Sequence, residues 1–129
     1  MQLGTLDHIN VRTAHLDAMR QWYTEVLGMT DGRRPNFPFG GAWLYANDRP
    51  CVHLVEVERQ PKTTEPRLEH FAFAAKGLSD FIATLEARSI PYQTASVPDV
   101  EILQVNLFDP DGNHIHVDFS RDEAEPLGL

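Results

Sequence analysis

The sequence predicts an α+β fold in which a unit of one strand, one helix and three strands occurs twice. Leu-Asp-His at residues 6–8 returns as Leu-Glu-His at residues 68–70. Residues 43–54 hold two apolar stretches around an acidic turn, and the same arrangement returns at residues 106–117. The distance along the chain between the two copies is the same for both matches to within one residue. Self-similarity at a fixed period is typical of one supersecondary unit used twice, because half a domain cannot bury its apolar face alone.

The first copy begins with a strand and a helix. Residues 6–12 alternate polar and apolar side chains, which is the pattern of a half-buried strand. Residues 18–27 place apolar side chains three and four positions apart, which predicts an amphipathic helix. We expect Asp17 to cap the start of this helix and Gly28 to follow its end.

The rest of the chain completes the first copy and repeats its order. A strand leading into a loop is expected over 30–39. The remaining elements are strands at 41–46, 51–57, 69–75, 92–95, 102–108 and 114–119 and a second helix at 78–88. Residues 59–67 are polar, hold two prolines and lack periodicity, so they form a linker. In each copy the helix would cover one face of a small sheet and leave the other face for a cavity.

Length and composition predict a single domain over residues 1–129. We place its modules at about 5–58 and 68–120, followed by a charged tail at 121–129. The 42% hydrophobic and 23% charged content is that of a soluble globular protein. Nineteen acidic against eleven basic residues give a net charge of −8, which argues against nucleic acid and membrane as partners.

Two further observations indicate the compartment. Cys51 is the sole cysteine, which excludes an intrachain disulfide and fits a reducing environment. No stretch approaches the roughly 20 apolar residues of a membrane span, and residues 1–4 lack the features of a signal peptide. We therefore expect a cytoplasmic protein.

The repeat preserves histidines at two positions: His8 corresponds to His70, and His53 corresponds to His116. Their neighbours along each strand are apolar and would pack under the helices, so the four imidazoles face the opposite side. If the two sheets curl around a shared cavity, all four could bind one metal ion. Neutral imidazole suits Zn, Ni, Fe(II), Co or Cu and disfavours Ca or Mg sites.

Alternative assignments remain open for these residues. A single strand histidine is more often a hydrogen-bonded polar residue than a metal ligand, so the prediction depends on the repeat. His114 lies on the same face as His116, one pleat nearer the turn, and competes with it for the ligand assignment. Arg12 and Arg34 are candidates to bind a substrate carboxylate or phosphate. The expected substrate-binding set also contains Trp43, Gln104 and Asn106, for which core packing and cross-strand hydrogen bonding are the alternatives.

Four segments in this order resemble the vicinal oxygen chelate superfamily: LDHINVR at 6–12, WYTEVLG at 22–28, HFAF at 70–73 and FDPDGN at 108–113. That superfamily includes glyoxalase I, fosfomycin-resistance thiol transferases, extradiol dioxygenases, methylmalonyl-CoA epimerase and metal-free bleomycin-binding proteins. The resemblance runs from about residue 5 to about residue 120. Residues 34–35, 39–44 and 53–54 further resemble a glyoxalase-like subgroup.

The resemblance implies two βαβββ modules whose sheets form a cupped cavity around one divalent metal, which is Zn, Ni, Fe(II), Co or Mn. It implies His8, His53, His70 and His116 as ligands, and a homodimer whose metal sites are shared between chains. His116 departs from the family pattern, because that position usually holds Glu. Four neutral imidazoles would leave the ion its full charge and favour an anionic substrate oxygen. The proton shuttle would pass to another base, a displaced histidine or Asp118.

Three functions follow from the resemblance. The first is a metal-dependent glyoxalase-like enzyme, with lyase, isomerase or thiol-transfer chemistry, acting on a small oxygenated substrate that chelates the metal. His116 and Asp118 would be its catalytic residues. The second is an extradiol-type Fe(II) dioxygenase, and the third is a metal-free protein that sequesters a small molecule, as bleomycin-binding members do. The matched histidines argue against the third, because a pocket without metal needs no such set.

Overall fold

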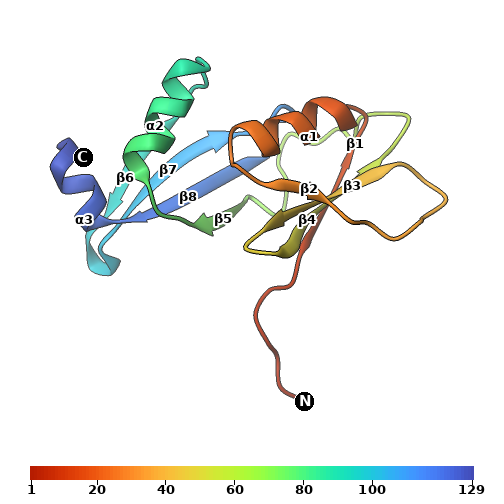
Figure 1. Ribbon diagram of the computed structural model, residues 1–129, viewed down its shortest axis with the longest axis horizontal. Coiled ribbons are helices and arrows are strands. Elements are labelled where there is room, and N and C mark those ends of the chain that lie inside the picture. Colours follow the sequence, from red (N-terminus) through yellow and green to blue (C-terminus); the bar gives the residue numbers. More distant parts are fainter. The chain divides into compact units, whose positions relative to one another are not determined.

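The computed structural model describes residues 1–129, except for the side chain of residue 98. The chain divides into two compact units, Met1–Thr63 and Thr64–Leu129, and each is described by itself (Figure 1). Each unit is built on a four-stranded sheet. Across the described residues, no helix is both long enough and apolar enough to cross a membrane.

The first unit has the predicted order of one strand, one helix and three strands. Its elements are β1 (Ile9–Thr13), α1 (Leu16–Glu25), β2 (Thr30–Gly32), β3 (Gly41–Ala46) and β4 (Arg49–Glu56). The strands lie in the order β1-β4-β3-β2, with β1 parallel to β4 and the other pairs antiparallel. The strand expected within 30–39 is therefore short, and a loop connects it to β3.

The second unit repeats this topology. Its elements are β5 (His70–Ala74), α2 (Leu78–Ala87), β6 (Gln93–Val97), the 3₁₀ turn η1 (Pro98–Val100), β7 (Ile102–Phe108) and β8 (His114–Ser120). The strand order is β5-β8-β7-β6, again with the first strand parallel to the last. The register also agrees, because Ile9 pairs with Val52 and the equivalent Phe71 pairs with Ile115. The prediction of two tandem βαβββ modules is confirmed.

Each sheet buries one face. In the first unit α1 packs against β2, β3 and β4 (Figure 1), and its Met19 and Tyr23 are fully buried. In the second unit Leu78 and Leu85 of α2 are fully buried. The fully buried strand residues include Leu44, Val52 and Leu54 in the first unit and Val105, Leu107 and Ile115 in the second. Burial of each such side chain stabilises the fold by about 1.5–3 kcal/mol. Because side chains alternate along a strand, residues one position away face the opposite side.

The start of α1 differs from the prediction, because His15 and not Asp17 is the N-cap residue. The side-chain oxygen of Thr13 accepts a hydrogen bond from the amide of His15 at 2.9 Å, and the carbonyl of His15 accepts one from the amide of Met19 at 3.0 Å. Asp17 lies in the first turn, where a carboxylate still interacts favourably with the positive end of the helix. Gly28 follows the helix with a φ of 67°, as predicted.

The turn between β7 and β8 is held by one buried carboxylate. Asp109 is 4% exposed, and its Oδ1 accepts hydrogen bonds from the amides of Asp111 at 3.0 Å and Asn113 at 2.9 Å. Its Oδ2 accepts a third hydrogen bond from the side chain of Asn113 at 2.8 Å. Gly112 has a φ of 84°, which favours glycine. These contacts fix where β8 begins.

Residues 121–127, which the sequence predicts as part of a charged tail, are helical. They form α3 (Arg121–Ala124) and the 3₁₀ turn η2 (Glu125–Leu127). Ala124 is 1% exposed. The Glu123 carboxylate accepts hydrogen bonds from the amides of Gly77 at 2.7 Å and Leu78 at 2.9 Å, at the start of α2. The segment is thus tied to a helix that lies far from it in the sequence.

Candidate metal centre

Three histidines gather on one face of the second sheet. His70 begins β5, while His114 and His116 are the first and third residues of β8. The parallel pairing sets His70 opposite His114 and Ala72 opposite His116. One ring nitrogen from each histidine can be chosen so that all three lie within 4.8 Å of one another. The rings of His70 and His116 stack with centroids 4.0 Å apart.

A single carboxylate orients two of these rings. The Nδ1 of His70 and the Nδ1 of His114 both hydrogen-bond to Glu69, the latter at 2.8 Å. These hydrogen bonds, that of His70 first, lower the pKa of the Glu69 carboxyl. Because an ionised carboxylate only accepts hydrogen bonds, Nδ1 is the donor in each ring, and Nε2 of His70 keeps its lone pair.

His114 is the least available of the three histidines. Its Nε2 lies 3.2 Å from Oδ1 of Asn106, a residue of β7. Both of its ring nitrogens therefore have partners, and ligation through Nε2 would require Asn106 to move away. The sequence analysis gave His114 as an alternative to His116 as a metal ligand. The evidence for it was the two-residue spacing, which puts both side chains on one face of a strand.

His116 has the properties of a ligand. It is 8% exposed, and within the described part of the chain its buried Nδ1 has no hydrogen-bond partner. Burial lowers the pKa of its imidazole, and the nearby rings of His70 and His114 lower it further. The ring is therefore neutral near pH 7 and offers a lone pair. A buried nitrogen without a partner costs free energy unless something binds it.

Asp118 lies two residues beyond His116 on the same face of β8. Among the described residues no group hydrogen-bonds to its buried Oδ1. Burial raises the pKa of its carboxyl, against the opposing effect of His116 and His70. Gln104 pairs with Asp118 across the strands, and Asn106 pairs with His116. Gln104 and Asn106 share one face of β7, because the residues that alternate with them, Leu103, Val105 and Leu107, are buried.

The first unit brings together His8 and His53. The ring of His53 stacks on His8 at 4.0 Å and on Trp43 at 4.1 Å, and His53 is 7% exposed. Its Nε2 donates to the carbonyl of Pro50 at 2.8 Å, which leaves Nδ1 with the lone pair. Burial lowers the pKa of His53. The Nδ1 of His8 hydrogen-bonds to Asp7 at 2.7 Å, as the equivalent His70 does to Glu69.

The predicted arginines differ in their surroundings. Arg12 is exposed on β1. Arg34 is half-buried in the loop before β3, and its Nη2 donates to the carbonyl of Phe39 at 2.9 Å. The expected site residues thus fall into two groups, one in each unit. Convergence of all four histidines on one ion stays a prediction.

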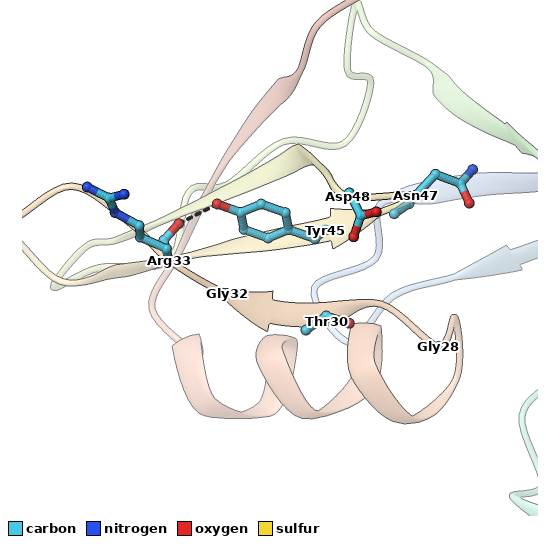
Figure 2. A pocket seen from close by; sticks show the side chains of 8 residues that line it. Gly28, Thr30, Gly32, Arg33, Tyr45, Asn47 and Asp48 are labelled. Carbon is cyan, nitrogen blue, oxygen red and sulfur yellow. Dashed lines mark hydrogen bonds between the residues drawn. The ribbon is translucent and has the colours of Figure 1, made fainter.

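The first unit holds a cavity of about 330 Å³ (Figure 2). Gly28, Thr30, Gly32, Arg33, Tyr45, Ala46, Asn47 and Asp48 line it. The Tyr45 hydroxyl donates to the carbonyl of Arg33 at 2.5 Å, and a Cβ on Gly32 would come within 2.7 Å of the Tyr45 ring. None of the predicted ligands lines this cavity, so it is not the metal centre.

Comparison with known proteins identifies the family of the chain. Residues 5–117 match the Glyoxalase/Bleomycin resistance protein/Dioxygenase superfamily. The chain belongs to this superfamily. Among its relatives, the manganese-dependent 2,3-dihydroxybiphenyl 1,2-dioxygenase of Geobacillus genomosp. 3 is 32% identical over 80 residues, 60% of this chain. The matched segment spans 25% of that enzyme's length.

Solved structures of the superfamily share the fold. The glyoxylase/bleomycin resistance protein/dioxygenase domain from Frankia sp. EAN1pec has a TM-score of 0.76 at 19% identity, covering 93% of this chain and all of that one. The trypanothione-dependent glyoxalase I of Leishmania major has a TM-score of 0.72 at 19% identity, covering 98% of this chain and 94% of that one. The lactoylglutathione lyase of Agrobacterium tumefaciens has a TM-score of 0.69 at 18% identity, with coverages of 92% and 95%.

Proposed function

We propose that this superfamily member is a metal-dependent enzyme of the glyoxalase-like type that acts on a small oxygenated substrate. The observation that carries the proposal is the histidine cluster of the second unit, whose three donor atoms lie within 4.8 Å of one another. His70 and His116 are the firmest ligands, because they lie together in this cluster and each has a ring nitrogen that keeps its lone pair. His8 and His53 complete the set by repeat equivalence, and His114 is the alternative third ligand.

The donor set suits a divalent transition metal. Burial keeps His116 neutral, and Glu69 holds His70 in the tautomer that presents Nε2. Zn, Ni, Fe(II) and Co suit imidazole nitrogen, and Mn is included because the dioxygenase relative is named as manganese-dependent. A bound ion would act as a Lewis acid on the substrate oxygens.

Asp118 is the proposed base. Its carboxyl stands beside His116 with one oxygen that lacks a described partner, and its raised pKa brings it closer to the working range of a general acid or base. It would take a proton from the substrate and return it, the role that a ligand carboxylate would otherwise fill. His116, if displaced from the ion, is the second candidate for this role.

Polar and aromatic residues around the two histidine groups would hold the substrate. Gln104 and Asn106 present amides on the face of Asp118 and His116. Arg12 and Arg34 would bind a carboxylate or phosphate of the substrate. Trp43 would pack against it beside His53.

An extradiol-type dioxygenase is the second candidate function. It is favoured by the similarity to the dioxygenase of Geobacillus genomosp. 3, whose name specifies 2,3-dihydroxybiphenyl as its substrate. A catechol would supply two adjacent oxygens to the ion. A metal-free binding protein is the third candidate, and it would leave the buried nitrogen of His116 unexplained.

The proposal includes a cytoplasmic homodimer with a small-molecule substrate and no nucleic-acid or membrane partner. The net charge of −8 supports the last two points, because phosphate-rich partners would be repelled. The single cysteine fits a reducing compartment.

The test is elemental analysis of protein purified without added metal, followed by activity assays. We expect about one transition-metal ion per chain in the parent protein and in the control His15→Ala, and none in His70→Ala or His116→Ala. Methylglyoxal–glutathione adducts and catechols, the latter with oxygen uptake, then separate the two enzymatic candidates. Stoichiometric metal in both His70→Ala and His116→Ala would sink the metalloenzyme proposal.

A further inference from the structure

The loop between β2 and β3 carries exposed aromatic side chains beside a cation. The rings of Phe37 and Phe39 stack with centroids 5.2 Å apart, and the Trp43 ring lies 6.4 Å from that of Phe37. Phe37 is 39% exposed and Phe39 is 45% exposed. Neighbouring apolar rings left in water are a feature of ligand-binding surfaces. Arg34, Phe37, Phe39 and Trp43 are called the aromatic platform below.

Arg34 is held in position on this platform. Its guanidinium carbon lies 4.9 Å from the centre of the Phe37 ring and 5.1 Å from that of Phe39. Nη2 donates to the carbonyl of Phe39 at 2.9 Å. Within the described part of the chain, no carboxylate forms an ion pair with Arg34. By contrast, Arg20 pairs with two carboxylates, and Arg49 and Arg121 pair with one each. The remaining N–H groups of the fork are available to an anion.

Gly40 and Gly41, where the loop enters β3, make room for this arrangement. A Cβ on Gly41 would lie 3.1 Å from Nη2 and 3.2 Å from Nε of Arg34, and would also collide with the carbonyl of Leu54. A Cβ on Gly40 would collide with the side chain of Glu56. The guanidinium of Arg34 therefore lies close to a stretch of backbone that has no side chain. Its position is fixed between this backbone and the rings of Phe37 and Phe39.

The platform continues into the histidine pair of the first unit. The Trp43 ring is stacked nearly parallel to that of His53, with an interplanar angle of 7° and a centroid distance of 4.1 Å. A flat ligand that stacks on the platform would therefore lie next to His53 and, through it, His8.

We infer that the aromatic platform binds planar aromatic carboxylates, with the ring of the ligand on Phe37, Phe39 and Trp43 and its carboxylate on Arg34. The guanidinium fork matches a carboxylate with two parallel hydrogen bonds, and the rings supply the stacking surface. Binding of such a ligand does not depend on the proposed function. The proposed function is needed only for the further step that this ligand class is the substrate of the enzyme.

Calorimetric titration of metal-free protein with three matched probes tests the ligand class. 2-Naphthoate has both features, 2-naphthamide lacks the charge, and decalin-2-carboxylate lacks the planar ring. We expect 2-naphthoate to bind at least about tenfold more tightly than either of the others. Equal affinity for the acid and the amide, equal affinity for the planar and saturated acids, or no binding of 2-naphthoate at millimolar concentration overturns the inference.

Variants of neighbouring arginines test the role of Arg34. Arg34→Lys keeps the charge and loses the planar fork, so the affinity for 2-naphthoate should fall about tenfold while that for 2-naphthamide stays within about twofold. The matched control is Arg33→Lys, at the adjacent exposed arginine, which should bind 2-naphthoate as the parent does. An equal loss in the two variants, or no loss in Arg34→Lys, counts against the inference.

Metal content measured on the protein as purified, before metal is removed for the titrations, separates this inference from the proposed function. Binding of 2-naphthoate by a parent protein that is purified without any metal would refute the metalloenzyme and support the platform. Metal retention without 2-naphthoate binding would refute the platform alone.

Discussion

At the scale of single residues, the acid that precedes each first-strand histidine has a defined task. Asp7 and Glu69 hydrogen-bond to Nδ1 of the histidine that follows them, and Glu69 also reaches His114. Such an outer carboxylate fixes the tautomer and direction of a ligand ring. The unit that repeats is therefore an acidic residue followed by a histidine, Asp7-His8 in the first copy and Glu69-His70 in the second.

Replacing Glu69 with Gln should weaken metal binding without unfolding the protein. The amide retains the size of the side chain but removes the ionised acceptor that orients His70 and His114. We expect the affinity for Zn to fall about 10- to 100-fold in competition titrations with a chelator. The control Glu65→Gln, in the exposed linker, should match the parent. An unchanged affinity in Glu69→Gln would show that the carboxylate does not orient a ligand.

The buried histidines also predict how the stability of metal-free protein depends on pH. Burial lowers the pKa of His53 and His116 in the folded state, so below about pH 6.5 the unfolded chain binds more protons than the folded chain. The free energy of unfolding should therefore fall as the pH drops from 7 to 5.5. Urea denaturation after metal removal measures this slope, which should be smaller in His116→Gln. A flat profile in the parent would contradict the burial of neutral rings.

At the scale of elements, the strands and helices that carry a clear period were predicted from sequence to within a few residues. The periodicity of apolar residues indicates which side chains face the core. For β3, β7, β8 and α2 the predicted bounds agree with the observed bounds to within one residue. The N-cap of α1 was missed because the hydroxyl of Thr13, two residues before His15, supports a turn there, and this local contact starts the helix before Asp17. The helical form of residues 121–127 was missed for a different reason, because no local pattern indicates it and Glu123 ties the segment to the distant start of α2.

The same distinction applies to the candidate site. The repeat singled out His70 as the equivalent of His8 and His116 as the equivalent of His53, and the structure stacks the rings of His70 and His116. The bridge from Glu69 to His114 spans 45 positions in the chain, and no spacing rule connects them. The position of Arg34 depends on the absence of a side chain at Gly41, which the sequence shows only as the first residue of a predicted strand.

The contact of Glu123 with α2 gives a prediction at this scale. Its carboxylate satisfies two amides at the start of the helix, where backbone donors lack partners within the helix. Glu123→Ala should lower the free energy of unfolding by about 1 kcal/mol, measured by urea denaturation. Asp122→Ala, at the neighbouring exposed acid, is the control and should change it by less than about 0.5 kcal/mol. Equal effects in the two variants would mean that the cap contributes nothing.

At the scale of the whole molecule, two small units each bury one face of a four-stranded sheet. Large apolar side chains remain exposed in both units, among them Phe39 and Phe108, and closed twofold assembly is the usual way to cover such surface. We therefore expect a homodimer, with light scattering at micromolar concentration giving about twice the chain mass of 14.6 kDa. A mass of one chain under those conditions would contradict the homodimer and the shared metal site with it.

The turn held by Asp109 sets the phase of the strand that follows. His114, His116 and Asp118 occupy alternate positions of β8, and Ile115 and Val117 occupy the positions between them. Adding or removing one residue in this turn would exchange the two sets, so that the imidazoles would enter the apolar layer and the branched aliphatic side chains would face the proposed metal site. The length of the Asp-Pro-Asp-Gly-Asn loop therefore decides which face of β8 carries the histidines. The three hydrogen bonds to Asp109 hold the loop at that length and so maintain the register of the strand.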